Sequence, residues 1–287
     1  MTVSELHRPA PAPRPEPLAR GRRVRPDARI LAGGGLVLVV VLAGLAAPWL
    51  APYGPLEQIR GANLVGASAQ HWFGTDEVNR DVFSRTLFGI RTNLAIVVPA
   101  VLVGAALGTL LGLLATTHRA LDTLTQRAFD VVLAFPALIL AIALAAAFGP
   151  GATTVAVVIA VVEVPLFGRL VRSSVLSIRE RPYVEAAEVI GASRRWVLRR
   201  HVLPNSLEPL GVQLALSLST AVFVEGAMSF IGIGVRPPDP SLGAIVSGAV
   251  PNMDANPFYA IGPLAVVAAL VLGFLLVSQG ISRTRRS

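Results

Sequence analysis

The sequence predicts an all-α, polytopic membrane protein with six transmembrane helices and both ends on the cytoplasmic side. Three observations lead to this prediction. Hydrophobic residues make up 53% of the 287 residues and charged residues only 15%, whereas a soluble domain is about 25% charged. Six apolar stretches are long enough to cross a bilayer. Most of the arginines lie in the segments on one side of those stretches.

The six predicted spans are mostly apolar, and each is close to the ~20 residues that cross ~30 Å of hydrocarbon as a helix. A short joint, Gly149-Pro150-Gly151, separates the third span from the fourth. Within the fourth, Glu163 and Pro165 interrupt the apolar run. In chain order, the predicted spans cover residues 30–50, 93–117, 128–148, 153–171, 207–231 and 258–278.

The distribution of arginine sets the predicted orientation. All 25 basic residues are arginine, against 17 acids, for a formal net charge of +8. Arginine-rich segments remain in the cytoplasm, and with the N-terminus inside, twenty of the 25 arginines fall in cytoplasmic segments. A basic excess also raises nucleic acid as a partner. Because membrane topology accounts for these arginines, no nucleic acid partner is expected.

Both ends of the chain are predicted to be cytoplasmic tails, residues 1–29 and 279–287. The first is rich in arginine and proline, and it holds too little apolar sequence to become ordered. A cleaved secretory signal containing Arg22-Arg23 is the alternative. That alternative is disfavoured because the following apolar run exceeds the roughly 7–15 residues of a signal core.

The composition excludes several kinds of chemistry. The chain has no cysteine, which removes disulfides, cysteine-bound metal centres and thiol nucleophiles. It has no lysine either, and the phosphate-binding loop of P-loop ATPases requires one. Its four histidines are scattered without a nearby second ligand. We therefore expect a non-catalytic protein with no metal site and no cofactor bound by this chain.

The external segment 51–92 is longer than a simple connection requires. From Asp81 onward, apolar residues including Val82, Phe83 and Leu87 alternate with charged residues at roughly helical spacing. This pattern predicts a short amphipathic helix that lies at the membrane interface before the second span. A solvated loop with a capped helix start is the alternative.

The cytoplasmic segment 173–206 is predicted to form two short helices joined by a turn. Pro182 suits the first turn of the first helix, and Gly191 can adopt the left-handed backbone that ends it. Ser193 can cap the second helix, which Pro204 then stops. Such an exposed pair suits docking to another protein. An arginine-rich hairpin that only obeys charge topology is the alternative.

The same segment carries a spaced pattern that is similar to a known one. Glu185-Ala186-Ala187 is followed by Gly191, by His201 and by Leu203-Pro204. The pattern resembles the coupling loop in the permease subunits of bacterial ABC importers. The small alanine side chains would let a partner surface approach the backbone of the first helix.

Further stretches between residues 30 and 278 resemble the dipeptide/oligopeptide/nickel permease family. The chain departs from that family at Glu163, where the family usually has a small residue, and in its arginine-rich C-terminal tail. The resemblance implies an ABC importer type I permease core with five helices in residues 93–278. The first of the matching stretches resembles the C-type permease of a pair. These stretches are residues 71–85, 129–136, 169–172, 201–205 and 225–235.

The resemblance also implies partners. A second homologous permease would complete a heterodimer, two ATP-binding subunits would use ATP and magnesium, and an extracytoplasmic binding protein would deliver substrate. The expected location is the bacterial cell membrane, with lipids around the multi-pass chain. The implied ATPase-coupling residues are Glu185, Ala186, Ala187, Gly191, His201, Leu203 and Pro204.

Three acids are expected to lie in or beside the spans, where ionisable groups are costly and mark functional candidates. Glu163 is expected near mid-bilayer in the substrate path, where it would bind a cationic group, with a packing role as the alternative. Glu225 is expected in the substrate path near the outer mouth, where an anchoring role for that mouth or for a loop turn is favoured over substrate binding. Asp130 is expected at a helix N-terminus, where the helix dipole favours an acid.

Di- and oligopeptides are the expected cargo, with nickel chelates, glutathione-like peptides and haem as alternatives. A proton-coupled secondary transporter is an alternative of another class, but such proteins typically contain internal repeats, which this sequence does not display. A membrane-embedded enzyme would need a nucleophile with its base or a metal cluster, and the scattered acids and histidines supply neither.

Overall fold

The computed structural model describes residues 27–189 and 203–284, together with Gly191, Ser193, Trp196 and Arg200 between them. Of the predicted first tail, only residues 27–29 belong to this part. The described residues are mainly helical, and their only β pairing is an isolated bridge between Thr75 and Asp81. In chain order the helices are α1 (Ala28–Leu45), α2 (Ala47–Leu50), α3 (Val82–Ala115), α4 (Arg119–Leu133), α5 (Ala137–Phe148), α6 (Ala152–Arg179), α7 (Pro182–Val189), α9 (Leu203–Ile231), α10 (Leu242–Ala249), the 3₁₀ helix η3 (Val250–Asn252) and α11 (Phe258–Thr284).

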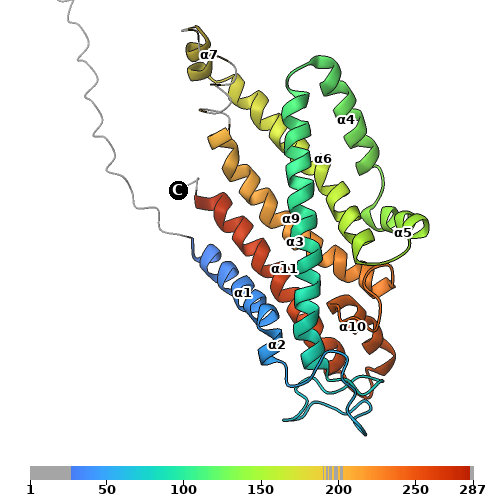
Figure 1. Cartoon of the computed structure of the whole chain (residues 1–287). Coiled ribbons are helices and arrows are strands. Elements are labelled where there is room, and N and C mark those ends of the chain that lie inside the picture. Colours follow the sequence, from blue (N-terminus) through green and yellow to red (C-terminus); the bar gives the residue numbers. More distant parts are fainter. Residues whose placement is uncertain are drawn as a thin grey trace, which may run out of the picture.

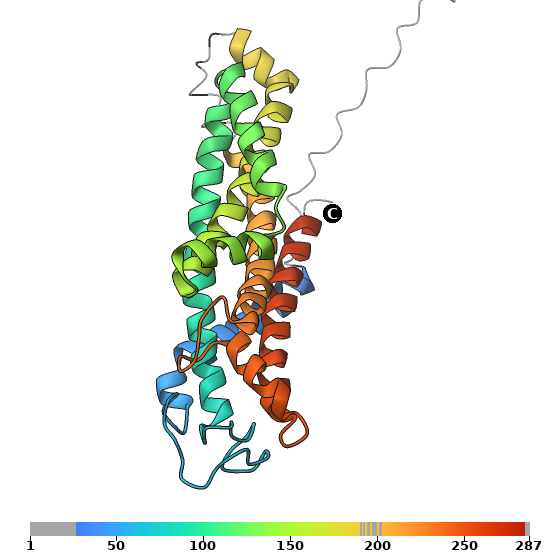
Figure 2. The ribbon, with the colours of Figure 1, turned by 90° about the vertical axis from the view of Figure 1, so that its right-hand side faces the viewer.

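The helices form an elongated bundle in which α3 packs alongside α6 (Figures 1 and 2). Helix α9 contacts both of them, α11 packs on α9, and α1 lies against α11. The loop that precedes α3 lies with α10 at one end of the bundle, and α7 lies at the other end (Figure 1). Apolar side chains such as Leu87, Val158 and Leu270 fill the space between these helices.

Glycines allow α3 and α6 to approach closely. A Cβ atom on Gly108 would lie 2.3 Å from the Val164 carbonyl oxygen, and one on Gly112 would lie 2.4 Å from that of Gly168. The reverse face of Gly168 is covered by Phe129 of α4, whose ring would meet an added Cβ at 2.4 Å. Small residues at four-residue spacing are a common way for membrane helices to pack.

The contact between α1 and α11 depends on glycine in the same way. A Cβ on Gly33 would lie 2.5 Å from the Gly273 carbonyl oxygen, and one on Gly280 would lie 2.4 Å from the Ile30 side chain. The first and last of the long helices therefore pair tightly, although about 250 residues of chain separate them in sequence.

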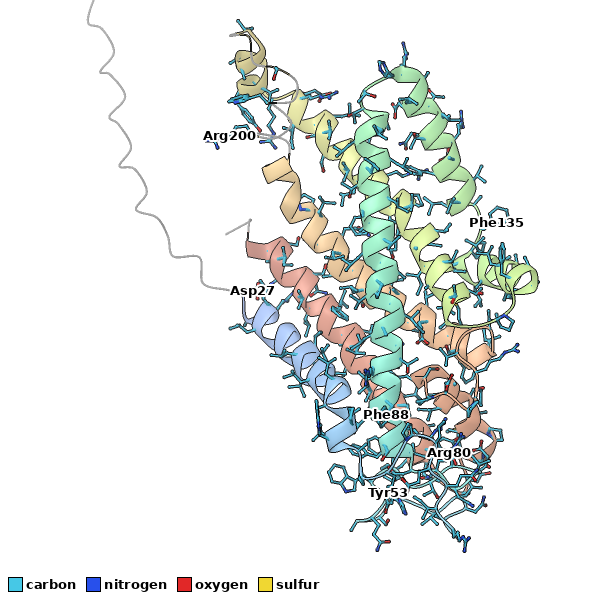
Figure 3. All side chains as sticks on the ribbon, viewed as in Figure 1. Asp27, Tyr53, Arg80, Phe88, Phe135 and Arg200 are labelled. Carbon is cyan, nitrogen blue, oxygen red and sulfur yellow. The ribbon has the colours of Figure 1, made fainter. Side chains whose placement is uncertain are left out.

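The predicted third span, 128–148, is wrong as a single straight helix. It is divided between α4 and α5, whose axes are bent by 88°. Pro136 is the N-cap of α5, with φ −56° and ψ 135°. Helix α4 ends before it, because proline has no N–H to continue a helix and restricts the backbone of the residue before it. Phe135, labelled in Figure 3, lies at this bend. Among the described residues, five helices are long and apolar enough to span a membrane, or six if this bent pair counts as one span.

The fourth predicted span is continuous despite Glu163 and Pro165, because both lie inside the 28-residue helix α6. The separate interfacial helix predicted before the second span is wrong. Residues 82–92 are the first turns of the 34-residue helix α3. The Asp81 carboxylate caps that helix by accepting a hydrogen bond from the Ser84 N–H at 2.7 Å, and from this cap the helix continues without a break to Ala115.

Replacing Gly112 by alanine tests the close approach of α3 and α6. The added methyl group would overlap the Gly168 carbonyl oxygen, so we expect the variant to lose about 1–3 kcal/mol of stability. Gly35→Ala on α1 is the matched control, since no atom lies within 4 Å of its added Cβ. Thermal unfolding in detergent should show a lower melting temperature for Gly112→Ala only. Equal melting temperatures for both variants would contradict the contact.

Candidate functional site

Helix α7 forms a short element beyond the end of α6. The Arg181 carbonyl accepts a hydrogen bond from the Val184 N–H at 2.9 Å in its first turn. Val184 packs in a cluster with Val175 and Ile178 of α6, while Val189 is 82% exposed. The helix therefore has one face held by α6 and a second face open to a partner.

The predicted coupling residues divide between α7, the turn after it and the start of α9. Ala186 is exposed on α7 and Ala187 is buried. Gly191 has φ +90°, the left-handed backbone expected of a glycine that ends a helix. After it, the Ser193 hydroxyl accepts a hydrogen bond from the Trp196 N–H at 3.3 Å.

The remaining coupling residues are placed only in part. Glu185 lies in α7, and Leu203 and Pro204 are the first two residues of α9. His201 and most of the predicted second short helix lie outside the described residues.

Ion pairs join α4 to α6. The Arg172 guanidinium donates to both oxygens of Asp122, at 2.5 and 2.6 Å, and Arg169 donates to Asp130 at 2.5 Å. The prediction that Asp130 lies at a helix N-terminus is wrong, because Asp130 lies in the last turn of α4. These pairs were not predicted. The sequence did contain a signal for them. The two arginines are three residues apart and the two aspartates are eight apart, so the members of each pair fall on one face of a helix.

Glu163 is 4% exposed and faces α9 inside the bundle of this chain. The Ser217 hydroxyl donates to its Oε2 at 2.5 Å, and the Gln213 amide donates to Ser217 at 3.2 Å. Beside Glu163 lies a cavity of about 60 Å³ between α5, α6 and α9. Ala137 of α5 covers one side of it. The cavity is otherwise lined by Val158, Ile159, Val162, Thr220, Ala221 and Val224.

Glu225 is completely buried and has a different set of partners. Its carboxylate accepts hydrogen bonds from the Asn93 amide of α3 and, at 2.8 Å, from the Ser229 hydroxyl. That hydroxyl in turn accepts from the Val235 N–H at 3.1 Å. Glu225 therefore connects α9 to α3 and to the turn that follows α9. The structure does not bring Glu163 and Glu225 into a common site.

Buried charges organise the loop that precedes α3 (Figure 3). The Asp76 carboxylate accepts from the Arg80 side chain at 2.7 Å and lies 3.6 Å from Arg85. The Arg85 guanidinium also donates to the carbonyls of Pro55 at 2.7 Å and Pro238 at 3.3 Å. It thereby joins this loop to the one between α9 and α10.

Two further contacts fasten the same loop to other helices. The His71 Nδ1 lies 2.9 Å from the Asp81 carboxylate that caps α3, and the Tyr259 hydroxyl of α11 lies 2.8 Å from Glu77. The sequence prediction of an external loop did not include this network, because its partners lie up to 182 residues apart. Several loops and helix ends thus form one rigid cap.

Among the described residues, no group of three or more histidine, cysteine or acidic side chains could hold a metal ion. The long apolar helices, with carboxylates hydrogen-bonded between them, define a protein that crosses the membrane several times. The chain belongs to the family of binding-protein-dependent transport system inner membrane components, whose model matches residues 107–284. It is therefore a multi-pass permease component of the inner membrane, as predicted from the sequence.

Two named relatives extend the similarity over most of the chain. The dipeptide transport system permease protein DppC of Alkalihalophilus pseudofirmus is 38% identical over 250 residues, which cover 86% of this chain and 82% of the relative. The glutathione transport system permease protein GsiD of Escherichia coli O1:K1 is 37% identical over 262 residues, which cover 91% and 86%. The predicted resemblance to the peptide permease family is confirmed.

Solved structures share the fold. A crystal structure of the inward-facing MetNI methionine ABC transporter superposes with a TM-score of 0.59, at 19% identity over 71% of this chain and 96% of that one. A crystal structure of an amino acid ABC transporter with histidines gives a TM-score of 0.53, at 19% identity over 71% and 95%. These likenesses confirm the predicted ABC importer permease architecture.

The hydrogen bond between Asn93 and Glu225 gives a test of the buried contact. Asn93→Leu removes a donor and leaves a buried carboxylate oxygen without it, which we expect to cost about 1–3 kcal/mol of stability. Glu225→Gln is the control, because its amide oxygen still accepts from Ser229, and a turn of the Asn93 side chain lets the unpartnered Asn93 Oδ1 accept from the new amide N–H. Thermal unfolding should rank Asn93→Leu below both the control and the unsubstituted protein. A melting temperature unchanged by Asn93→Leu would contradict the role of this bond.

Proposed function

We propose that this chain forms half of the translocation path of an ATP-driven importer of di- and oligopeptides. The observation that carries the proposal is the similarity, over more than 80% of both chains, to permeases named for dipeptide and glutathione transport. Both names specify short peptides. Nickel chelates and haem are the alternative cargoes for the same machinery.

In this proposal the energy comes from other subunits. The chain contains no lysine, so it cannot form the phosphate-binding loop of a P-loop ATPase. Two ATP-binding subunits would bind ATP and magnesium, and a second homologous permease would complete the path. A binding protein would deliver the peptide to the rigid cap in front of α3.

The proposed orientation places both chain ends and α7 in the cytoplasm and the loop before α3 outside. Arginine supports it, because the segments assigned to the cytoplasm hold twenty of the 25 arginines. Helix α7 then faces the ATP-binding subunits. We assign it, together with Gly191 and the start of α9, to docking against those subunits.

Transport in reconstituted vesicles tests the proposed function. The complete transporter with its binding protein should accumulate a labelled dipeptide only when ATP is supplied to the ATP-binding subunits. Dissipating the proton gradient should leave uptake unchanged, since the gradient plays no part in the proposed mechanism. Uptake that follows the gradient and ignores ATP would overturn the proposal in favour of a secondary transporter.

The docking assignment predicts uncoupling variants. Glu185→Lys reverses a charge on α7, and Gly191→Pro imposes a negative φ on a backbone that has φ +90°. We expect either variant to remain in the membrane and to lose ATP-driven uptake. Gly211→Ala on α9 is the control, because no atom lies within 4 Å of its added Cβ. Uptake at the unsubstituted rate by either uncoupling variant would refute the assignment.

Cysteine labelling tests the orientation without background labelling of this chain, because the chain has no cysteine of its own. We expect a cysteine at Ser68 to react with a membrane-impermeant maleimide in intact cells. A cysteine at Ser193 should react only in inside-out vesicles, since it follows α7. The reverse pattern would invert the topology.

Glu163 is proposed to contact the positively charged amino terminus of the peptide when α5 moves away from the small cavity beside it. Glu163→Gln keeps the hydrogen-bond acceptor for Ser217 but removes the charge. We expect uptake of a dipeptide with a free amino terminus to fall relative to that of its N-acetylated form. Glu225→Gln is the control, and it should not change the ratio. An unchanged ratio in Glu163→Gln would assign Glu163 to packing alone.

A further inference from the structure

A pocket that the proposed transport function does not use lies where α1 begins and α11 ends. It has a volume of about 350 Å³ and opens between α1, α9 and α11. The corner can be found in Figure 3 from Asp27, which is labelled at the start of α1. The pocket has an apolar side and a side rich in polar and basic groups. It is lined by Arg29, Val212, Leu216, Ser278, Gln279, Ser282 and Arg283.

Within the described part of the chain, acids do not neutralise the two arginines of the pocket. Among the residues that the structure describes, no carboxylate forms an ion pair with Arg29 or Arg283. The nearby Asp27 carboxylate instead accepts from the Arg29 backbone N–H at 2.9 Å. The Arg29 guanidinium donates to the Gln279 side chain at 2.9 Å, which holds it beside the pocket. The positive charge at this corner is therefore available to an anion.

Ser278 supplies a second, independent indication of a ligand. Its side chain lines the pocket, yet the residue is only 2% exposed. Within the described part of the chain, no group makes a hydrogen bond with its hydroxyl. The Ser278 oxygen is not one of the fully buried side-chain atoms that lack a partner, so it is open to the pocket that the residue lines. An occupant of this pocket that carries acceptor oxygens would accept a hydrogen bond from it.

The depth of the pocket matches the headgroup region of a bilayer. Helix α1 has 18 residues and therefore rises about 27 Å, close to the ~30 Å of the hydrocarbon core. At its far end, Trp49 of α2 is exposed, as tryptophans at a membrane interface commonly are. Arg29 then lies one hydrocarbon thickness away, at the level of the opposite headgroups.

The surface next to the pocket is apolar. Leu31, Leu38 and Leu42 are exposed along α1, and Val212 and Leu216 form the apolar side of the pocket itself. A free anion would make no use of this surface, whereas the acyl chains of a lipid would lie along it. The sequence adds arginines at positions 22, 23 and 25 before the corner and at 285 and 286 after it.

We propose that this pocket binds the phosphate headgroup of an anionic phospholipid, whose acyl chains run along the apolar face of α1. Arg29 and Arg283 would contact the phosphate, and the Ser278 hydroxyl would donate to one of its oxygens. Basic pockets between membrane helices on the cytoplasmic side bind anionic headgroups in this way. The assignment to the inner leaflet rests on the proposed orientation, which the labelling of Ser68 and Ser193 tests separately.

Thermal unfolding of the assembled transporter in mixed micelles tests the proposal. We expect phosphatidylglycerol to raise the melting temperature in a saturable manner, because a ligand of the folded state stabilises it, and phosphatidylcholine to have no such effect. Arg29→Gln and Arg283→Gln should each raise the half-saturating lipid concentration about fivefold. The control variant carries Arg60→Gln and Arg119→Gln, which remove two exposed positive charges elsewhere, and it should respond as the unsubstituted protein does.

A second pair of variants tests the same proposal if the arginine variants fold poorly. Ser282 lines the pocket and is exposed. Ser282→Asp should abolish the response to phosphatidylglycerol by repelling the phosphate, whereas Ser282→Asn should preserve it. An equal response from Ser282→Asp and Ser282→Asn would overturn the proposal, as would an unsubstituted protein that ignores the lipid. An equal stabilisation by inorganic phosphate would replace the lipid with a soluble anion.

Discussion

The close approach of α3 and α6 is the contact on which the rest of the bundle depends. Lipid provides no hydrophobic force between helices, so membrane helices associate through packing and polar contacts. Gly108 and Gly112 let the backbone of α3 meet that of α6, and Gly168 leaves room for Phe129 of α4 on its other side. The same pair of helices carries Glu163 on α6 and Gly104 on α3. A Cβ added to Gly104 would lie 2.6 Å from the Glu163 Cβ. A larger side chain along this line would separate α3, α4 and α6 together.

The two ends of this bundle differ in how they are held. At one end, the Asp76, Arg80 and Arg85 network joins the loop before α3 to neighbouring loops, and Glu225 joins α9 to the turn after it. At the other end, α7 packs on α6 through one face only. Helix α6 has 28 residues and rises about 42 Å, so one rigid element runs from near the capped end to the exposed helix. In the proposed function, such an element would carry a displacement of α7 toward the substrate path.

Arginine has more than one use in this chain. Its distribution along the sequence supports the proposed orientation, but individual arginines also make specific contacts. Arg169 and Arg172 join α4 to α6, and Arg85 joins two loops. Arg29 and Arg283 line one pocket, and no acid among the described residues forms an ion pair with either of them. The anion site proposed at that corner would use the positive charge of these two arginines.

The sequence by itself determined the class of protein and most of its helices. Apolar runs of membrane length must become helices because lipid offers no other partner for backbone N–H and C=O groups, and the Gly191 turn was predicted from the conformational freedom of glycine. Only the tertiary structure decided the bend at Pro136, the continuity of α3 through residues 82–92 and the partners of Glu163 and Glu225. Those partners lie 54 and 132 residues away. Periodicity reports which face of a helix is apolar, but it carries no information about which distant helix that face meets, and that choice is made by packing.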